Sequence, residues 1–174
     1  MTAAPTKNLL IVWHSRTGTA RQMAQAAVRG AQAALRELQA EAVVKVSCLP
    51  ARDCQPDNVL NADGFLFCAP ENLASLSGEM KEFFDRSYYA VLDHIEGRPY
   101  GAMIAAGSDG AGAMKQVERI ATGWRLRRAV PSLIVNTGAQ TPQAILAPKQ
   151  LADEPRRQCE EMGGTLAALL AGFG

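Results

Sequence analysis

Several patterns are missing from this chain of 174 residues, and each absence excludes a class of protein. The four cysteines form no CxxC pair and no cysteine–histidine spacing suited to zinc, so we expect free thiols and no metal site. No apolar run approaches the ~20 residues that cross a bilayer, and the start MTAAPTKN lacks a basic segment followed by an apolar core. We therefore expect a cytoplasmic protein without membrane insertion.

The chain also lacks an excess of either charge and the motifs of several enzyme classes. Its 18 basic and 17 acidic residues give a net charge of +1, which offers no general attraction for nucleic acid. There is no GxxxxGK[ST] of a nucleotide triphosphatase, no GxSxG of a hydrolase, and no serine with an evident histidine and acid partner. The length and composition predict one domain over 1–174, with 1–7 as a flexible tail.

The chain alternates apolar strands with amphipathic helices. Helical spacing of apolar residues predicts helices over 20–38, 80–91, 114–124 and 153–173, the last with Asp153 as its cap and Pro155 in its first turn. Strands are expected at 9–13, 43–48, 65–69, 100–106 and 129–135. This alternation predicts an α/β fold: a five-stranded parallel sheet between two layers of helices.

The composition of the strands predicts their order. Lys45 and Ser47 in the second strand and Pro131 in the last are features of sheet edges. A doubly wound sheet of order 2-1-3-4-5 fits, with a ligand crevice at the carboxyl ends of the first and third strands. A receiver domain of this topology needs aspartates after those strands, where this chain has His14-Ser15 and Pro70-Glu71. The long irregular stretch 136–151 indicates a functional segment or an interface.

The loop after the first strand has the composition of a phosphate site. Ser15, Thr17 and Thr19 supply hydroxyls, and Gly18 lets the backbone approach a ligand. The first turn of the next helix has N–H groups without helical partners and the positive end of the helix dipole, so an anion can bind there. The same residues would serve equally as simple helix capping.

Two further loops are expected at the same edge of the sheet, at 70–78 and 107–112. Flexible loops rich in accessible backbone groups suit a flat polar ring whose edge exchanges hydrogen bonds. A phosphate pocket beside two such loops suggests a mononucleotide. The glycines of the third loop do not match the dinucleotide fingerprint GxGxxG, so a tight strand-to-helix turn is the alternative there.

These segments resemble a known family. IVWHSRTGTARQMA resembles the flavodoxin phosphate loop, and APENLASLSGEMKEFFDR is similar to the flavin-ring loop and following helix of NAD(P)H-dependent FMN reductases and NAD(P)H:quinone oxidoreductases. AAGSDGAG stands where that family has its third flavin-contacting loop. The resemblance implies a flavodoxin-like domain that binds FMN through Ser15, Arg16, Thr17, Gly18, Thr19, Ala20, Pro70, Glu71, Asn72, Leu73, Gly78, Gly107, Ser108, Asp109, Gly110 and Gly112.

The chain departs from the family pattern at both ends of this expected site. Ala20 replaces a threonine that usually opens the helix, and Arg16 could offset the missing hydroxyl or simply be solvated. Asn72 and Leu73 stand where reductases often place aromatic residues against the flavin. Trp13 and Trp124 are alternative ring contacts, although large aromatics are more often core residues.

Several polar residues near these loops have two interpretations. His14 could touch the ligand or be structural, and Asp109 could accept a flavin N–H or cap a helix. His94 belongs to a connection at the opposite edge of the sheet. An arginine cluster could receive an NADPH phosphate, meet a partner or lie in solvent at a helix end; it comprises Arg119, Arg125, Arg127 and Arg128.

The resemblance implies an oxidoreductase that takes electrons from NADH or NADPH and passes them to a small-molecule acceptor such as a quinone or free flavin. Because the cofactor performs the redox chemistry, no catalytic side chain is required. The alternatives are an electron-carrier flavodoxin, disfavoured by the near-neutral charge, and a flavodoxin-fold binding module without redox activity. A homodimer or homotetramer is expected, with Tyr89 as a candidate interface residue.

Overall fold

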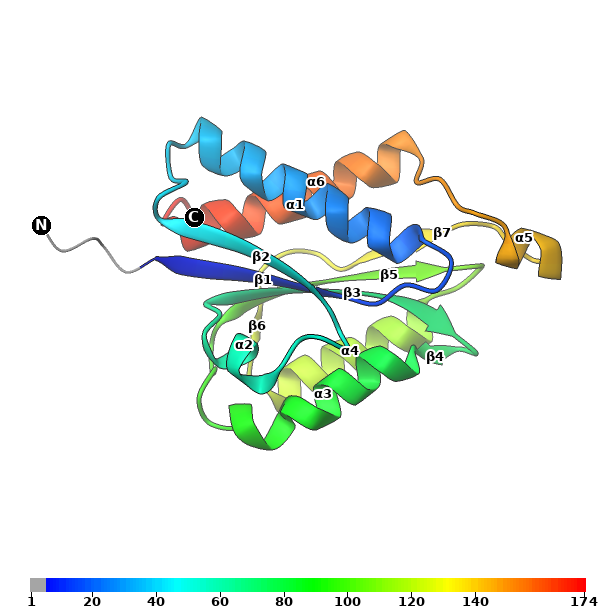
Figure 1. Cartoon of the computed structure of the whole chain (residues 1–174), viewed down its shortest axis with the longest axis horizontal. Coiled ribbons are helices and arrows are strands. Elements are labelled where there is room, and N and C mark those ends of the chain that lie inside the picture. Colours follow the sequence, from blue (N-terminus) through cyan, green and yellow to red (C-terminus); the bar gives the residue numbers. More distant parts are fainter. Residues whose placement is uncertain (1–5) are drawn as a thin grey trace, which may run out of the picture.

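Parallel strands form the middle layer of the computed structural model, which describes residues 6–174 (Figure 1). Hydrogen bonding orders them β2-β1-β3-β5, and β6 and β7 both pair with the remaining side of β5. With β6 and β7 taken as one interrupted strand, this is the predicted order 2-1-3-4-5, and the predicted fold is confirmed. The strands are β1 Lys7–Trp13, β2 Val44–Pro50, β3 Gly64–Asn72, β5 Pro99–Ala106, β6 Arg127–Arg128 and β7 Leu133–Asn136.

The ends of two predicted segments differ from the structure. The last strand is not continuous over 129–135: the Ala129 N–H still bonds to Tyr100 O at 2.9 Å, but β7 begins only at Leu133. Pro131 lies in the gap and has no N–H to donate to a ladder. Of the expected tail 1–7, residues 1–5 lie outside the described residues, whereas Lys7 is already the first residue of β1.

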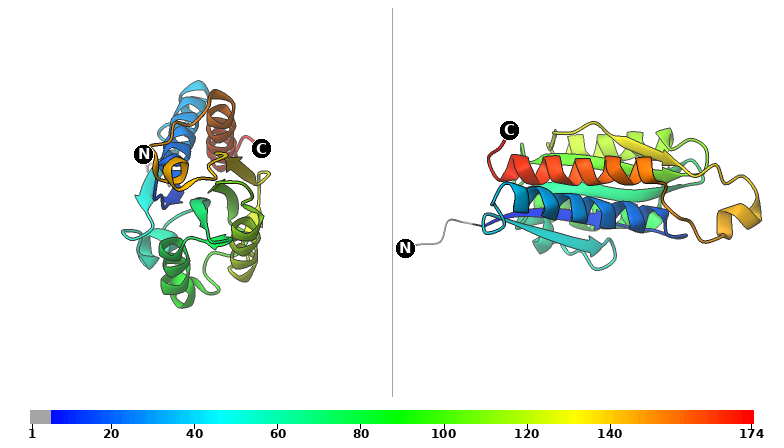
Figure 2. Two further views of the ribbon diagram at one scale, coloured as in Figure 1. Left: turned by 90° about the vertical axis from the view of Figure 1, so that its right-hand side faces the viewer. Right: turned by 90° about the horizontal axis from the view of Figure 1, so that it is seen from above.

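Helices cover both faces of the sheet, as the two views at right angles show (Figures 1 and 2). Helices α1 Thr19–Glu37 and α6 Asp153–Leu170 lie together on one face. Helices α2 Pro56–Leu60, α3 Gly78–Val91 and α4 Ala111–Gly123 lie on the other. Side chains alternate along β1, so Leu9 and Ile11 pack under α1 and α6 while Leu10 and Val12 pack on the opposite face. None of the helices within 6–174 is long and apolar enough to cross a membrane.

The start of α6 differs from the prediction. Its cap is Ala152, and Asp153 is the first helical residue. The Asp153 carboxylate accepts a hydrogen bond from Arg156 Nη2 at 2.7 Å instead of capping the backbone. Its negative charge still lies in the first turn, where it interacts favourably with the helix dipole.

Helices α1 and α6 approach each other through glycines. A Cβ added to Gly163 would overlap the backbone carbonyl of Ala27, and one added to Gly30 would overlap the backbone of Glu160. Buried alanines fill the rest of this contact on α1. Small side chains therefore allow the two helices to pack backbone against backbone.

Aromatic rings fill the opposite face. Phe67 of β3 lies 5.0 Å from the Phe84 ring and 6.2 Å from the Trp124 ring, centroid to centroid, in edge-to-face geometry. Trp124 is 4% exposed within this cluster. The structure therefore excludes it as a ring contact and makes it a core residue.

The cysteines are free, as predicted. Burial raises the pKa of Cys48 to about 11 and those of Cys54 and Cys159 to about 12, so these thiols are protonated at neutral pH. Cys68 is completely buried, and its pKa is raised by the same cause.

Candidate functional site

A cavity of about 580 Å³ lies at the carboxyl ends of β1, β3 and β5. Its volume is within the ~300–1,000 Å³ typical of small-molecule sites, and its position is the switch point where chain direction reverses. We call it the strand-end cavity. Its lining comprises Ser15, Arg16, Thr17, Thr19, Ala20, Pro70, Glu71, Asn72, Leu73, Ala105, Ala106, Gly107, Thr137, Ala139, Ile145, Leu146 and Lys149.

The loop before α1, residues 14–18, has the geometry of an anion site, and we call it the phosphate loop after the family segment that it resembles. Gly18 caps the helix with φ of 105°, a left-handed conformation that glycine adopts without strain, and its N–H donates to Ser15 Oγ at 3.1 Å. The first turn of α1 contains no acidic residue. Thr19 Oγ1 is buried beside the cavity, with no hydrogen-bond partner among the described residues. An unpartnered hydroxyl and the orphan N–H groups of a helix N-terminus fit a phosphate group.

Two further residues in or beside this loop, Ala20 and Arg16, have clear positions. Ala20 is 1% exposed and packs into the core below α1, so it offers a ligand only its backbone. Arg16 is exposed on the loop and borders the cavity. Its guanidinium adds positive charge to the edge of the cavity.

The segment predicted as a loop at 70–78 is largely a β-hairpin. Strand β3 continues to Asn72, which pairs antiparallel with Ser75 of β4 Ser75–Leu76. Leu73 and Ala74 form the turn with φ of 51° and 60°, a conformation that costs energy for residues with a Cβ. Leu73 is fully exposed at the tip, beside the cavity.

Glu71 fastens this hairpin to α4. Its Oε1 accepts the Gly110 N–H at 2.9 Å and its Oε2 accepts the Ala113 N–H at 3.2 Å. Gly112 permits close approach, because an added Cβ would overlap the Ala74 carbonyl. The Glu71 carboxylate is therefore engaged with the first turn of α4, where the helix dipole favours negative charge.

Several predicted site residues lie outside the cavity lining. Asp109 precedes the cap residue of α4, and its Oδ1 accepts the N–H of Ala111, the first helical residue, at 3.2 Å. Gly110 has φ of 94° and caps α4. The structure brings the phosphate loop, the hairpin and Gly107 together around the cavity, whereas Gly18, Gly78, Ser108, Asp109, Gly110 and Gly112 do not line it.

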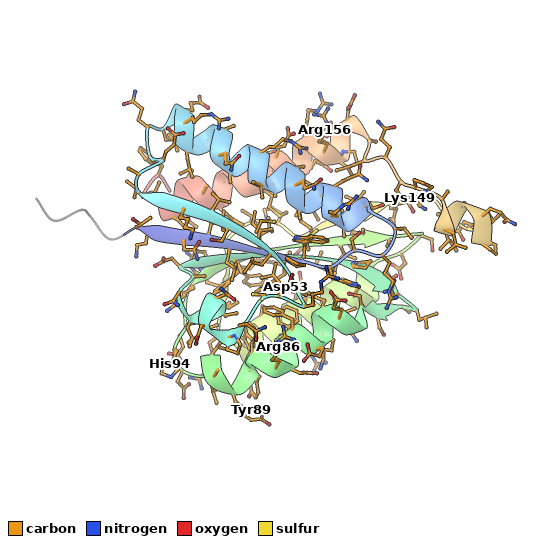
Figure 3. All side chains as sticks on the ribbon, viewed as in Figure 1. Asp53, Arg86, Tyr89, His94, Lys149 and Arg156 are labelled. Carbon is orange, nitrogen blue, oxygen red and sulfur yellow. The ribbon has the colours of Figure 1, made fainter. Side chains whose placement is uncertain are left out.

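A wall of the cavity comes from residues that were not predicted individually. The stretch 136–151 contains a short helix, α5 Pro142–Leu146, which projects beyond the ends of the strands (Figure 1). Lys149 stabilises it by donating through Nζ to the carbonyls of Ala144, Ile145 and Ala147, at 2.5, 2.8 and 2.7 Å. Figure 3 places Lys149 at this end of the molecule, with His94 and Tyr89 at the far end of α3. The sequence signal was the length of the irregular stretch.

Gln22 ties this wall to the phosphate loop. From the first turns of α1, its Nε2 donates to Lys149 O at 2.8 Å and to Gly18 O at 3.2 Å. Its Oε1 accepts the Leu151 N–H at 3.0 Å. One side chain of α1 therefore connects the phosphate loop that precedes this helix with a segment more than 120 positions later in the chain.

Comparison with known proteins agrees with this arrangement. A family model described as NADPH-dependent FMN reductase matches residues 14–141. The chain belongs to this family. It is 25% identical over 169 residues to a flavodoxin of Aquifex aeolicus, across 95% of the chain and 88% of that protein. It is 28% identical over 92 residues to an NAD(P)H dehydrogenase (quinone) of Acidithiobacillus ferrooxidans, across 45% of the chain and 46% of that protein.

Solved structures show the same fold. A flavodoxin from the domain Archaea superimposes with a TM-score of 0.72 at 16% identity, over 94% of the chain and 98% of that protein. An oxidoreductase from Corynebacterium diphtheriae superimposes with a TM-score of 0.70 at 17% identity, over 96% of the chain and 98% of that protein. The fold of this FMN reductase family member is thus flavodoxin-like.

We expect a Gln22→Ala variant of this FMN reductase family member to loosen the cavity wall. Three hydrogen bonds would be lost, each worth a net ~0.5–1.5 kcal/mol. Limited proteolysis within 137–151 should then accelerate about 10-fold, read by mass spectrometry of the fragments. Gln25→Ala is the matched control, since Gln25 is exposed on the same helix. Equal cleavage of the two variants would contradict the tethering role.

His14 is buried beside the phosphate loop in a structural arrangement. It is 7% exposed; its Nδ1 lies 2.7 Å from Ser77 Oγ, and its Nε2 lies 3.6 Å from Glu79 Oε2. Burial lowers the pKa of His14 below 6.5, and Arg16 and Arg52 lower it further, against the opposing effect of Glu79. The imidazole is therefore neutral at neutral pH.

This pKa shift predicts that acid destabilises the domain partly through His14. The unfolded chain, with a histidine pKa near 6.5, binds a proton that the native state excludes, so the free energy of unfolding falls as the pH drops through that value. His14→Asn removes the titrating group. We expect urea unfolding at a series of pH values from 7.5 to 5 to show a shallower loss of stability for the variant. If the free energy of unfolding fell equally steeply with pH in wild type and His14→Asn, the lowered pKa of His14 would be contradicted.

Proposed function

We propose that this chain binds FMN non-covalently in the strand-end cavity and transfers electrons from NADH or NADPH to a small acceptor such as a quinone or free flavin. Membership of the NADPH-dependent FMN reductase family supports the cofactor and the reaction class. The structural observation that carries the proposal is the unpartnered Thr19 hydroxyl at the head of α1, in a cavity shared by three sheet-end segments.

The lining divides naturally between the two ends of FMN. Residues 15–20 would bind the phosphate through backbone N–H groups and the hydroxyls of Ser15, Thr17 and Thr19. Pro70, Asn72, Leu73 and Gly107 would lie beside the ring. Gly78 would act indirectly by shaping the start of α3. Ser108, Asp109, Gly110 and Gly112 would do so by shaping the start of α4, to which the hairpin is attached.

Aliphatic side chains supply the ring surroundings that aromatic residues often provide. Leu73 is fully exposed, and Ile145 and Leu146 of α5 are 47% and 76% exposed, although all three are apolar and border one cavity. Exposed apolar side chains at the mouth of a cavity favour a ligand that covers them. When bound, FMN supplies the two-electron redox chemistry, and the chain positions it and excludes water.

Absorbance spectroscopy tests the proposal in two steps. The purified protein should be yellow or should become so on titration with FMN, with a perturbed flavin spectrum. Anaerobic mixing of the loaded protein with NADPH or NADH should then bleach the absorbance near 450 nm. A colourless protein that takes up no FMN would refute the proposal and favour a binding module without redox activity.

An electron carrier is the second candidate. The relative named flavodoxin aligns over 95% of the chain, which favours this function. The net charge of +1 disfavours it, because it provides no strongly acidic surface for steering toward a basic redox partner. FMN binding without bleaching by either nucleotide would select the carrier.

We also infer a cytoplasmic homo-oligomer. Free cysteines are typical of a reducing compartment. Tyr89 is 84% exposed on α3, next to the half-exposed Tyr88, and such aromatic residues are enriched at interfaces. Sedimentation analysis of wild type and Tyr89→Asp tests this assignment, with dissociation of the variant expected.

A further inference from the structure

A second cavity, of about 600 Å³, lies on the other side of the phosphate loop. It shares Ser15, Arg16, Thr17 and Leu146 with the strand-end cavity, so ligands in the two would be neighbours. We call it the arginine cavity. Its further lining comprises Trp13, His14, Gly18, Arg21, Pro50, Arg52, Glu79 and Pro148.

Three segments bring positive charge to this cavity. Arg16 comes from the loop after β1, Arg21 from the first turn of α1 and Arg52 from the loop after β2. Within residues 6–174, neither Arg16 nor Arg21 has an acidic partner at ion-pair distance, and Arg52 Nε lies 3.9 Å from Asp53 Oδ2. Glu79 is the single acidic residue of the lining. The charge here is therefore largely uncompensated within the described part of the chain.

The arginine cluster named in the sequence analysis, at 119–128, differs from this cavity because acidic residues lie close to it. Arg125 Nη1 lies 2.8 Å from Asp93 Oδ1, and Arg128 Nη1 lies 3.1 Å from Glu118 Oε1. Arg127 and Arg128 form β6, which pairs with Pro99 and Tyr100 at the start of β5, the end opposite the strand-end cavity. Neighbouring acids neutralise much of that cluster, so it resembles an ordinary solvated surface.

We propose that the arginine cavity is a second phosphate site, which binds the phosphorylated adenosine end of NADPH. Guanidinium groups bind phosphate through paired, charge-assisted hydrogen bonds. Trp13, Pro50 and Pro148 supply flat or apolar surface beside these charges, as a nucleoside requires. The assignment of this cavity to the electron donor NADPH rests on the proposed function. The binding of an adenosine phosphate in the cavity does not rest on it.

Calorimetric titration of the FMN-loaded protein with 2′,5′-ADP tests this site without measuring activity. We expect binding that weakens with salt, and weaker binding of 5′-AMP, which lacks the second phosphate. Arg52→Gln and Arg21→Gln should each reduce the affinity for 2′,5′-ADP roughly 10-fold to 100-fold. Neither residue lines the strand-end cavity, so the affinity for FMN should change little.

Arg119→Gln is the matched control, because Arg119 is exposed on α4 and the charge change is the same. Unchanged 2′,5′-ADP affinity in Arg52→Gln and Arg21→Gln, or an equal loss in Arg119→Gln, would overturn the site. Loss of FMN affinity instead would overturn it too, by making the cavity an outer part of the FMN site. If the protein binds no FMN, titration of the unloaded protein still tests the arginine cavity, so the two failures are distinguishable.

Discussion

A Thr17→Asp variant should lose FMN binding by roughly 100-fold or more. Thr17 is half-buried in the phosphate loop and borders both cavities, so an aspartate there would face the ligand's phosphate across a short distance. Two like charges ~4 Å apart near a protein surface repel by about 4 kcal/mol, before screening by salt. Titration followed by flavin fluorescence measures the change.

Thr17→Asn is the control, because asparagine has nearly the shape of aspartate without its charge. We expect FMN affinity within about 10-fold of wild type for this variant. The free energy of unfolding of the unloaded Thr17→Asp protein should be about 0.3–1 kcal/mol higher than that of Thr17→Asn, since the aspartate carboxylate lies near the N-terminus of α1. Equal FMN affinity for the two variants would mean that the phosphate binds elsewhere.

Gly163→Ala should lower the free energy of unfolding of the domain substantially. The new methyl group would overlap the backbone carbonyl of Ala27, which cannot move without shifting α1. Overpacking of this kind costs about 1–3 kcal/mol, which exceeds or cancels the gain of up to about 1 kcal/mol in helix propensity, in a domain stabilised by roughly 5–15 kcal/mol. Urea unfolding followed by far-ultraviolet circular dichroism measures the difference.

The neighbouring Gly164→Ala is the control in the same helix. Its added Cβ would lie 3.3 Å from Gly30 O and 3.4 Å from Ala34 Cβ, which is tight but free of overlap. Alanine gains up to about 1 kcal/mol of helix propensity over glycine, so the net change should be close to zero. A stability loss equal to that of Gly163→Ala would show that the helix contact is not the cause.

The fold and the helix start at Gly18 could be predicted because their signals are local. The apolar run at 9–13 predicts a buried strand, and the hydroxyls and Gly18 that follow predict a helix start open to an anion. Each property belongs to a few consecutive residues, whose conformational preferences do not depend on the rest of the chain.

The ring end of the site could not be predicted at the same detail because its geometry depends on distant contacts. Leu73 and Ala74 form a turn that usually requires asparagine or glycine, so the hairpin has no sequence signature. Helix α5 has five residues and is held by Lys149 and by the attachment of its following segment to Gln22. The capping role of Glu71 likewise depends on residues about 40 positions away.

The attachment of Glu71 to α4 makes the strand-end cavity common to both helical layers. One wall belongs to α1 on the first face of the sheet, and the hairpin wall is fixed to α4 on the second. A ligand that touches both walls therefore acts as a cross-link through the domain. Its binding free energy adds to the cohesion of the whole molecule, because neither layer can separate from the sheet without releasing it.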